Sequence, residues 1–462
     1  MARASGCSLT EPADLLLERF GPEPGWLSRM RRKCFELFRS MPPETSELYI
    51  RHYEAPTLEE HQILDMLGDG EERDVPEEFR HVKDYEEHPT VVYVGNQLAH
   101  IHLPEKLAKA GLELVELKQA LNKHEPYIRE RLQDMVNSPY VDKYTCLTHA
   151  LLNAGIFIRT PKSVRLEKPV RIMYILTRPA EAVFSKTLVV CEGESNLSVV
   201  EELHGMPESS GCLLGHHVQL LLGESSMLRH GVLQNLSNNN IYLGNRLTEV
   251  GRYSSALLVG SLIGSGLSKV RVDSAMQGDG SSVNDLELVF GDGEQRMDLT
   301  ANLHHIGFGT QGREVAKGVV KEKAKVIFKG MITVEKTAKN TSAYLAKHAM
   351  IMSPEARAYA IPSLEIKTDE VKATHSASVS QIDPDQIYYL MTRGIPYEEA
   401  RKMLALGFFE PVVSMIDLDE VRWGLRSLLE SKWGGSVTEL FEEPEVTVSS
   451  LFGTHYKYRY GR

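Results

Sequence analysis

Cysteine is scarce in this chain, and the spacing of the cysteines argues against a zinc-stabilised or disulfide-stabilised fold. The five cysteines lie far apart, with no CxxC spacing: Cys7, Cys34, Cys146, Cys191 and Cys212. Neither a zinc knuckle nor a disulfide framework is therefore indicated. A reducing cytoplasm is the compartment that fits this cysteine usage best.

Basic charge and long apolar runs are also in short supply. The chain has 52 lysines and arginines against 63 aspartates and glutamates, so its net charge is −11. Because phosphate binding relies on a basic surface, this balance argues against nucleic acid as the main partner. The longest weakly polar run, 254–266, is far shorter than the ~20 residues that cross a bilayer, and no charged-then-apolar leader opens the chain. We therefore expect neither a membrane span nor an export signal.

The common catalytic motifs are missing as well. There is no GxxxxGK[ST] phosphate loop, no HExxH, and no GxSxG elbow between a strand and a helix. Gly260, Gly264 and Gly266 follow a strand-like segment instead of opening a helix, which indicates turns in a strand-rich tract. Asp292 and Glu294 could form a glycosidase pair, but acids in turns are more often simply solvated.

What is present is the composition of a soluble globular protein, with 42% hydrophobic and 25% charged residues in 462. This length predicts two or three domains, or one long repetitive domain. The first part, 1–143, should be α-rich, with a hairpin that turns at Gly95-Asn96. Its helices are predicted at 11–20, 26–38, 103–121 and 127–135.

From residue 144 to residue 380 the pattern changes to short strands, after one more helix at 144–154. Polar turns recur, and those that begin at Gly193, Gly223, Gly251 and Gly278 are separated by 30, 28 and 27 residues. Strands with a turn of this period are typical of a parallel β-helix, in which each coil buries its inner face by stacking on the next. The alternative is an antiparallel sandwich, whose strand spacing of about 8 to 12 residues fits less well.

The strand-rich tract ends at a junction where the sequence becomes helical. Asp383 supplies an N-cap carboxylate just before a proline, and Gly394 ends this first helix. Pro396 opens a second helix, which Gly407 should close. We therefore predict a C-terminal helical part over 381–433.

Two further segments complete the expected organisation. A third helix with one apolar face is predicted over 417–433. The remaining residues are expected to form a loosely held extension. The chain is thus expected to have four parts: 1–143, 144–380, 381–433 and 434–462.

Histidines are the remaining candidates for metal chemistry. His216-His217 and His304-His305 are neighbours on predicted strands, so the members of each pair point to opposite faces and cannot chelate one metal together. A structural role is favoured for both pairs. His375 differs because it lies on the last coil, near the end most available to a partner. It is therefore the candidate ligand.

The junction also resembles a known family. It reads PSLEI at 362–366, DEVKATHSAS at 369–378, IDPDQIYYL at 382–390 and RGI at 393–395. These segments are similar to the signature of the SufB/SufD iron–sulfur cluster assembly proteins. A weaker likeness extends over 144–416.

This resemblance implies a right-handed parallel β-helix between N-terminal and C-terminal helical parts. It also implies a non-catalytic scaffold subunit, because SufB and SufD pair through the ends of their β-helices and each binds a SufC ATPase through its C-terminal helices. Carried over, 332–379 would be the pairing seam and 383–407 the ATPase dock. The docking residues would be Tyr388, Tyr389, Leu390, Arg393, Gly394 and Phe408.

The cluster chemistry carries over less completely. The SufB-type cysteine that lies 28 residues before the family histidine is replaced here by Lys347, and the cysteine usual two residues before that histidine is Ala373. The histidine itself is present as His375, and in SufD-type proteins it is implicated in cluster building. Since iron and sulfide prefer thiolate ligands, the chain should hold no stable cluster alone, and a transient Fe–S cluster is expected only in the complex. ATP would bind only to the partner ATPase.

We therefore favour a SufD-like subunit whose partners are a SufC-type ABC ATPase and a SufB-type paralogue, with no nucleic acid and no membrane. A self-paired homodimer, formed through the same seam, is the second hypothesis. A β-helix enzyme that acts on carbohydrate is the third.

Overall fold

A computed structural model describes residue 20 and residues 23–68, 71, 73–84 and 86–433 of the chain. These residues form two compact units, one that ends at Ile382 and one that begins at Asp383. The extension 434–462, and nearly all of the helix predicted at 11–20, lie outside the described residues. Across the described ranges, no helix is both long and apolar enough to cross a bilayer.

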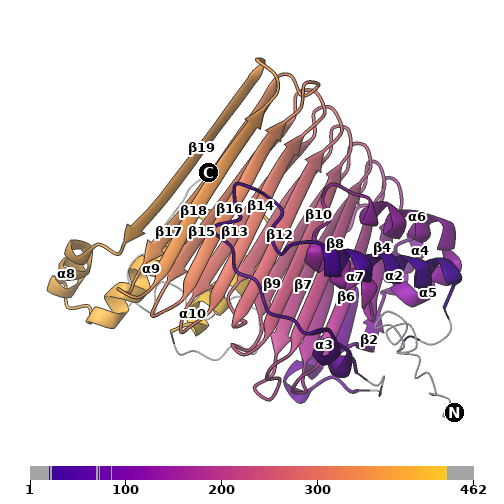
Figure 1. The fold of residues 1–462 in the computed structure, drawn as a ribbon, viewed down its shortest axis with the longest axis horizontal. Helices are drawn as coiled ribbons and strands as arrows, with labels where there is room; N and C mark the ends of the chain where they lie inside the picture. The colour runs from indigo at the N-terminus through magenta and orange to yellow at the C-terminus, as the bar shows by residue number, and fades with distance from the viewer. Residues whose placement is uncertain (1–19, 21–22, 69–70, 72, 85, 434–462) are drawn as a thin grey trace, which may run out of the picture. The chain divides into compact units, whose positions relative to one another are not determined.

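A parallel β-solenoid of about eight turns forms most of the first unit (Figure 1). One sheet contains β5 (Val170–Leu176), β7 (Asn196–Gly205), β9 (Met227–Asn235), β11 (Ser255–Leu262), β13 (Ser282–Gly291), β15 (Gln311–Val320), β17 (Thr341–Ile351) and β19 (Val371–Gln381). The other contains β4 (Ala154–Thr160), β6 (Ala182–Cys191), β8 (Leu213–Leu222), β10 (Ile241–Val250), β12 (Leu267–Met276), β14 (Arg296–His305), β16 (Lys325–Val334) and β18 (Arg357–Ile366). The predicted parallel β-helix is confirmed, and the antiparallel sandwich is wrong.

Close approach of successive turns explains the glycines that recur along the sequence. A Cβ on Gly223 would lie 2.7 Å from the backbone nitrogen of Gly193, and a Cβ on Gly251 would lie 2.6 Å from the carbonyl oxygen of Leu222. Only a residue without a side chain fits such contacts. The turn period in the sequence is therefore a consequence of backbone packing between coils.

The three glycines near residue 260 have different roles. Gly264 and Gly266 lie in the turn between β11 and β12, as predicted. Gly260 lies within β11, so the prediction of a turn there is wrong. A Cβ on Gly260 would overlap the carboxylate of Glu287, which stands next to it in register on β13. This glycine makes room for a buried acid.

The N-terminal region supplies the strands at one edge of each sheet. β1 (Thr90–Val94) pairs in parallel with β5 and antiparallel with β2 (Gln97–His102), so the predicted hairpin is confirmed. β3 (Glu113–Glu116) pairs antiparallel with β4. Short antiparallel strands therefore extend both parallel sheets at this end.

The prediction of one helix over 103–121 is wrong, because β3 interrupts it between α4 (Glu105–Lys109) and α5 (Leu117–Lys123). Gly111, with φ of 91°, lies just after α4. Leu114 and Val115 then pack into different hydrophobic clusters, as the alternation of a strand requires.

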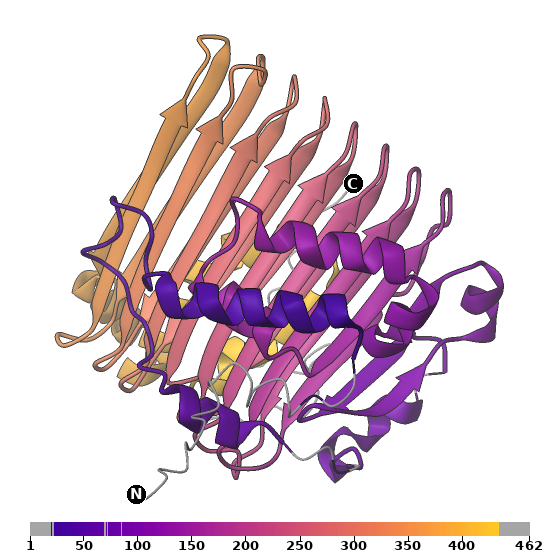
Figure 2. The same cartoon turned by 45° about the vertical axis from the view of Figure 1, so that its right-hand side comes forward.

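Helices cover the outer face of the nine-stranded sheet. Figure 2 shows α2 (Gly25–Ser40), in indigo, lying across the strands. Phe35 of α2 and Leu147 of α7 (Lys143–Ala150) share one buried cluster with Phe184 of β6. Helices cover the outer side of these strands and the solenoid core covers their inner side. The middle strands, such as β8, are therefore buried on both sides.

The other predicted helices of this region are confirmed, with one boundary changed. The segment 26–38 is within α2, and 127–135 is within α6 (Glu125–Val136). The helix predicted at 144–154 ends at Ala150, because β4 already begins at Ala154. Two short elements were not predicted: α3 (Glu60–Met66) and the 3₁₀ helix η1 (Glu77–Asp84).

Up to residue 433, where the described part of the second unit ends, it contains three helices: α8 (Pro384–Thr392), α9 (Tyr397–Val413) and α10 (Asp419–Ser431). The predicted N-cap is confirmed, since the Asp383 side chain accepts a 2.9 Å hydrogen bond from the backbone of Asp385. All three helices were predicted.

The predicted end of α9 at Gly407 is wrong. The helix continues to Val413 because Phe409 and Val412, in the following turn, are 0% and 1% exposed. Burial of these side chains outweighs the small helix propensity of one glycine.

Candidate functional site

The last coil of the solenoid is uncovered. β18 and β19 are the terminal strands of their sheets, so each presents a backbone edge without a strand partner among the described residues. Ile366 and Val379 are each 43% exposed, whereas Val334 and Ala349, their neighbours in register one coil earlier, are 0% and 1% exposed. The interior of the solenoid is thus open at this end, which is typical of a surface that another chain covers.

His375 lies on β19 in the same column as buried interior residues. In register it stands next to Leu345, which stands next to Glu314. Both of these residues are 0% exposed, and residues of one column share one face of a sheet. His375 itself is exposed. It therefore lies at the mouth of the interior, not on the outer surface.

A buried ion pair lies below this mouth, between Lys347 of the preceding coil and Glu314 of the coil before that. The Lys347 amine donates to the Glu314 carboxylate at 2.6 Å, and both side chains are 0% exposed. Burial raises the pKa of Glu314 to about 7 despite the lysine, because desolvation of the carboxylate outweighs that attraction. An ammonium held in this way offers no thiolate and no lone pair to iron.

His348 is a second histidine of the last coils that sequence reasoning missed. It lies on β17, with Nδ1 2.7 Å from the Ser378 hydroxyl and Nε2 3.3 Å from the Ser376 hydroxyl. Since residues 345 and 348 differ in parity, His348 faces away from the interior column of His375. Burial lowers the pKa of His348. In the part of the chain that the structure describes, no three His, Cys, Asp or Glu residues are grouped to hold a metal ion.

The paired histidines point to opposite faces, as predicted. His216 lies 3.2 Å from Glu201 inside the solenoid, whereas His217 lies 2.6 Å from His149 of α7 on the outer face. The pair at 304–305 is separated in the same way, between different partners. All these rings are held by neighbouring side chains, which fits a structural role.

The acids proposed as a glycosidase pair lie in the turn after β13. The Glu294 side chain is 84% exposed, and it forms a 3.8 Å ion pair with Lys323 of a neighbouring turn. This is the environment of a solvated turn acid.

The second unit presents an exposed aromatic surface of its own. Tyr388 and Tyr389 of α8 are 70% and 57% exposed, and the Arg393 guanidinium lies 5.2 Å from the centre of the Tyr389 ring. Gly394, with φ of 86°, leaves space beside them. Four of the six predicted docking residues are thus exposed.

The other two predicted docking residues, Leu390 and Phe408, are half-buried. The Phe408 ring lies 6.0 Å from that of Phe409, which is 0% exposed. Phe408 is thus less accessible to a partner than the two tyrosines of α8.

Comparison with known proteins decides the family. The family profile described as "SUF system FeS cluster assembly, SufBD core domain" matches residues 174–408. The chain belongs to the SufBD family. It is 29% identical over 416 residues to the iron-sulfur cluster assembly protein SufD of Bacillus subtilis (strain 168), which covers 89% of this chain and 94% of that protein. It is also 26% identical over 448 residues to an iron-sulfur cluster assembly SufBD family protein of Staphylococcus epidermidis (strain ATCC 12228), covering 93% and 94%.

The expected SufD-like membership of the SufBD family is therefore confirmed. The SufBD match begins within β5 and ends within α9. It includes the uncovered last coil with His375, and it includes α8 with its exposed tyrosines. Both candidate surfaces thus belong to the family region, which assigns this protein to iron–sulfur cluster assembly.

Proposed function

We propose that this SufBD protein is a non-catalytic, SufD-like scaffold subunit of a SUF-type assembly complex. It pairs with a SufB-type paralogue through β18 and β19. The observation that carries this proposal is the open end of the solenoid, where Ile366 and Val379 expose an interior that every earlier coil buries. Exposed apolar surface is unfavourable in water by about 25 cal/mol per Å², so covering this end stabilises the pair.

His375 contributes one ligand to a nascent cluster at that seam. The partner supplies the thiolates, because this chain has no cysteine after Cys212 and a lysine–glutamate pair occupies the interior below the mouth. The cluster is therefore cargo of the paired subunits and not a resident cofactor of this chain.

The helices α8 and α9 dock a SufC-type ATPase, which alone binds and hydrolyses ATP. Support comes from Tyr388, Tyr389 and Arg393, because exposed tyrosine and arginine are enriched where proteins bind each other. The sequence itself has no phosphate-binding loop of the GxxxxGK[ST] type.

Three variants of the full chain test the proposal by co-purification with both partners. Val379→Asp should lose the SufB-type partner and keep the SufC-type partner, because it places a charge on the uncovered interior. Tyr389→Asp should show the reverse. His375→Ala should keep both partners but lower the cluster yield in reconstitution.

The controls are matched in chemistry and exposure. Tyr253→Asp changes a tyrosine that is 59% exposed on a turn of the first unit, and His348→Ala removes the histidine that faces away from the interior. Both should behave like the wild type. The pairing and docking assignments are wrong if Val379→Asp and Tyr389→Asp retain both partners. A wild-type cluster yield from His375→Ala removes the ligand role alone.

A further inference from the structure

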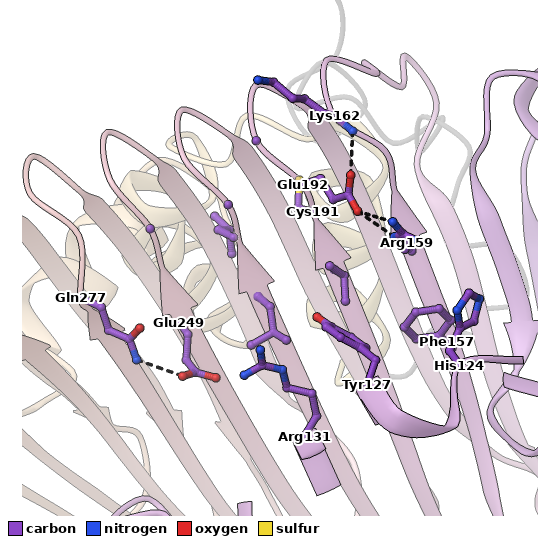
Figure 3. A pocket seen from close by; sticks show the side chains of 16 residues that line it. His124, Tyr127, Arg131, Phe157, Arg159, Lys162, Cys191, Glu192, Glu249 and Gln277 are labelled. Carbon is purple, nitrogen blue, oxygen red and sulfur yellow. Dashed lines mark hydrogen bonds and ion pairs between the residues drawn. The ribbon is translucent and has the colours of Figure 1, made fainter. Parts of the chain in front are cut away.

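A cavity of about 680 Å³ lies beside the first coils, and the proposed scaffold function does not use it. Its wall includes Val190 and Leu221 on the outer face of the nine-stranded sheet, and Tyr127 and Arg131 on α6. Figure 3 shows these α6 side chains among the residues of the strands. This volume is in the range of small-molecule sites, roughly 300 to 1,000 Å³.

Arg131 is the basic group of this cavity that no described carboxylate neutralises. Its Nε atom is buried and has no hydrogen-bond partner in the described part of the chain. The other basic side chains of the wall are matched by acids. Those pairs are Arg159 with Glu192 at 2.6 Å, Lys162 with Glu194 at 3.1 Å, and His124 with Glu113 at 2.6 Å.

The remainder of the wall suits a flat apolar group. The Arg131 guanidinium lies 5.3 Å from the centre of the Tyr127 ring, which holds the cation beside an aromatic face. Phe157, Val190 and Leu221 add apolar surface. The glycines of three stacked turns, at 193, 223 and 251, complete this side without side chains. A ring that enters the cavity would contact Tyr127 while an acidic group on it reached Arg131.

Glu249 sets a limit on the charge of the ligand. Its two carboxylate oxygens accept hydrogen bonds from Gln277 at 2.9 Å and from Gln219 at 3.4 Å. No ion pair neutralises this carboxylate within the described residues. A second anionic group on the ligand would be repelled here, whereas a neutral or donor group would not.

We propose that this cavity binds a small organic anion, a carboxylate or a phosphate ester with one flat apolar ring. The anionic group binds Arg131, the ring packs between Tyr127 and Leu221, and Glu249 excludes molecules with acidic groups at both ends. The site lies in the first unit and is independent of the seam and of the docking helices.

Titration of the full chain with benzoate, phenyl phosphate and benzamide tests this site, with affinities from ligand-observed NMR. Benzamide has the shape of benzoate without its charge, so it should bind about tenfold more weakly. Arg131→Gln should weaken the better anion about tenfold, because it removes a charge-assisted contact, and should leave benzamide unchanged. Glu249→Gln should strengthen anion binding.

Arg129→Gln is the matched control, since Arg129 is on the same helix but is 44% exposed and paired with Glu125. Arg131→Lys should restore part of the anion affinity, which a folding defect would not. Preference for benzoate identifies a carboxylate site, and preference for phenyl phosphate identifies a phosphate-ester site. The proposal is overturned if neither anion binds the wild type, or if Arg131→Gln binds both anions as the wild type does.

Discussion

Lys186 shows how a single buried ionisable group can make the stability of this fold depend on pH. The side chain is 0% exposed, and its amine lies 3.0 Å from the Gln219 amide oxygen and 3.3 Å from His217 Nδ1. Burial lowers the pKa of Lys186 to about 7, because no carboxylate is bonded to it. The unfolded lysine, by contrast, keeps its proton to about pH 10.5.

We predict that Lys186→Met raises the free energy of unfolding at pH 7 by about 2 kcal/mol, since an apolar side chain avoids desolvation of the amine. Between pH 7 and pH 10 the unfolded wild type binds the extra proton, so wild-type stability should rise with pH across that window. The advantage of the variant should shrink accordingly. Urea unfolding at several pH values measures both effects.

Lys106→Met, at an exposed position of α4, is the matched control and should change neither quantity. A difference between Lys186→Met and the wild type that stays constant from pH 7 to pH 10 would contradict the assigned protonation state.

The direction of His375 marks the limit of sequence reasoning at this scale. The family signature locates this histidine on the last coil. The face of the sheet to which its side chain points, however, depends on the exact register between coils. Leu345 and His375 are 30 residues apart, whereas Glu314 and Leu345 are 31 apart. A turn one residue longer would turn the ring outward. Arg131 was missed for a related reason, because its cavity joins segments that only the folded chain brings together.

At the scale of elements, the segment between α2 and α3 is an unpredicted strap across the outer face of the solenoid. Glu44 accepts from Lys329 at 2.7 Å and lies 3.4 Å from Lys269. Glu54 continues the attachment, because its backbone nitrogen donates to Asp298 at 2.9 Å. The strap is therefore held mainly by ion pairs to the strands beneath it.

We predict that Glu44→Gln lowers the free energy of unfolding by about 3 kcal/mol, since two buried lysines would share Asp298 alone. Although burial opposes it, the charges of Lys269 and Lys329 hold the pKa of Glu44 below its usual value. The stabilisation is thus present above about pH 4.5 and is lost as the pH falls through the folded pKa. Urea unfolding at neutral and acidic pH measures the effect.

Glu47→Gln, an exposed change in the same strap, should be nearly neutral. An equal loss from both variants, or a loss from Glu44→Gln that persists at acidic pH, would show that the ion pairs do not hold the strap.

Elements with local signals were predictable, and elements defined by distant contacts were not. The turns with glycine at 193, 223 and 251 indicate a solenoid, because the close approach of the neighbouring coil leaves no room for a side chain at these positions. The strand β3 carries no such signal, since its identity depends on pairing with β4. Gly407 gave a false helix end because the burial of Phe409 is invisible in the local sequence.

At the scale of the whole molecule, the uncovered end predicts self-association when no SufB-type partner is present. Sedimentation of the wild type should show a fraction of dimer that increases with protein concentration, because pairing buries the interior residues of the last coil. Val379→Asp should sediment as a monomer. Adding a SufB-type partner should replace the dimer by a one-to-one complex.

Tyr389→Asp is the control here, because it alters the second unit and should leave the dimer intact. If the wild type remains monomeric at every concentration, the prediction that the uncovered end self-associates is wrong. A homodimer that persists with the SufB-type partner in excess would favour the self-paired scaffold instead.

The stacking of coils also has a consequence for how the chain acquires its shape. Each coil contacts the coil before it and the coil after it, so a formed coil presents a surface on which the next coil can order. At one end of the solenoid the two sheets finish in β2 and β3, which pair antiparallel with their neighbours and so break the parallel repeat. At the opposite end β18 and β19 keep the parallel repeat, and their outer edges pair with no strand of the described residues. In the proposed pair, the partner subunit would add the next layer to this face, so assembly of the complex would complete the stacking that folding begins.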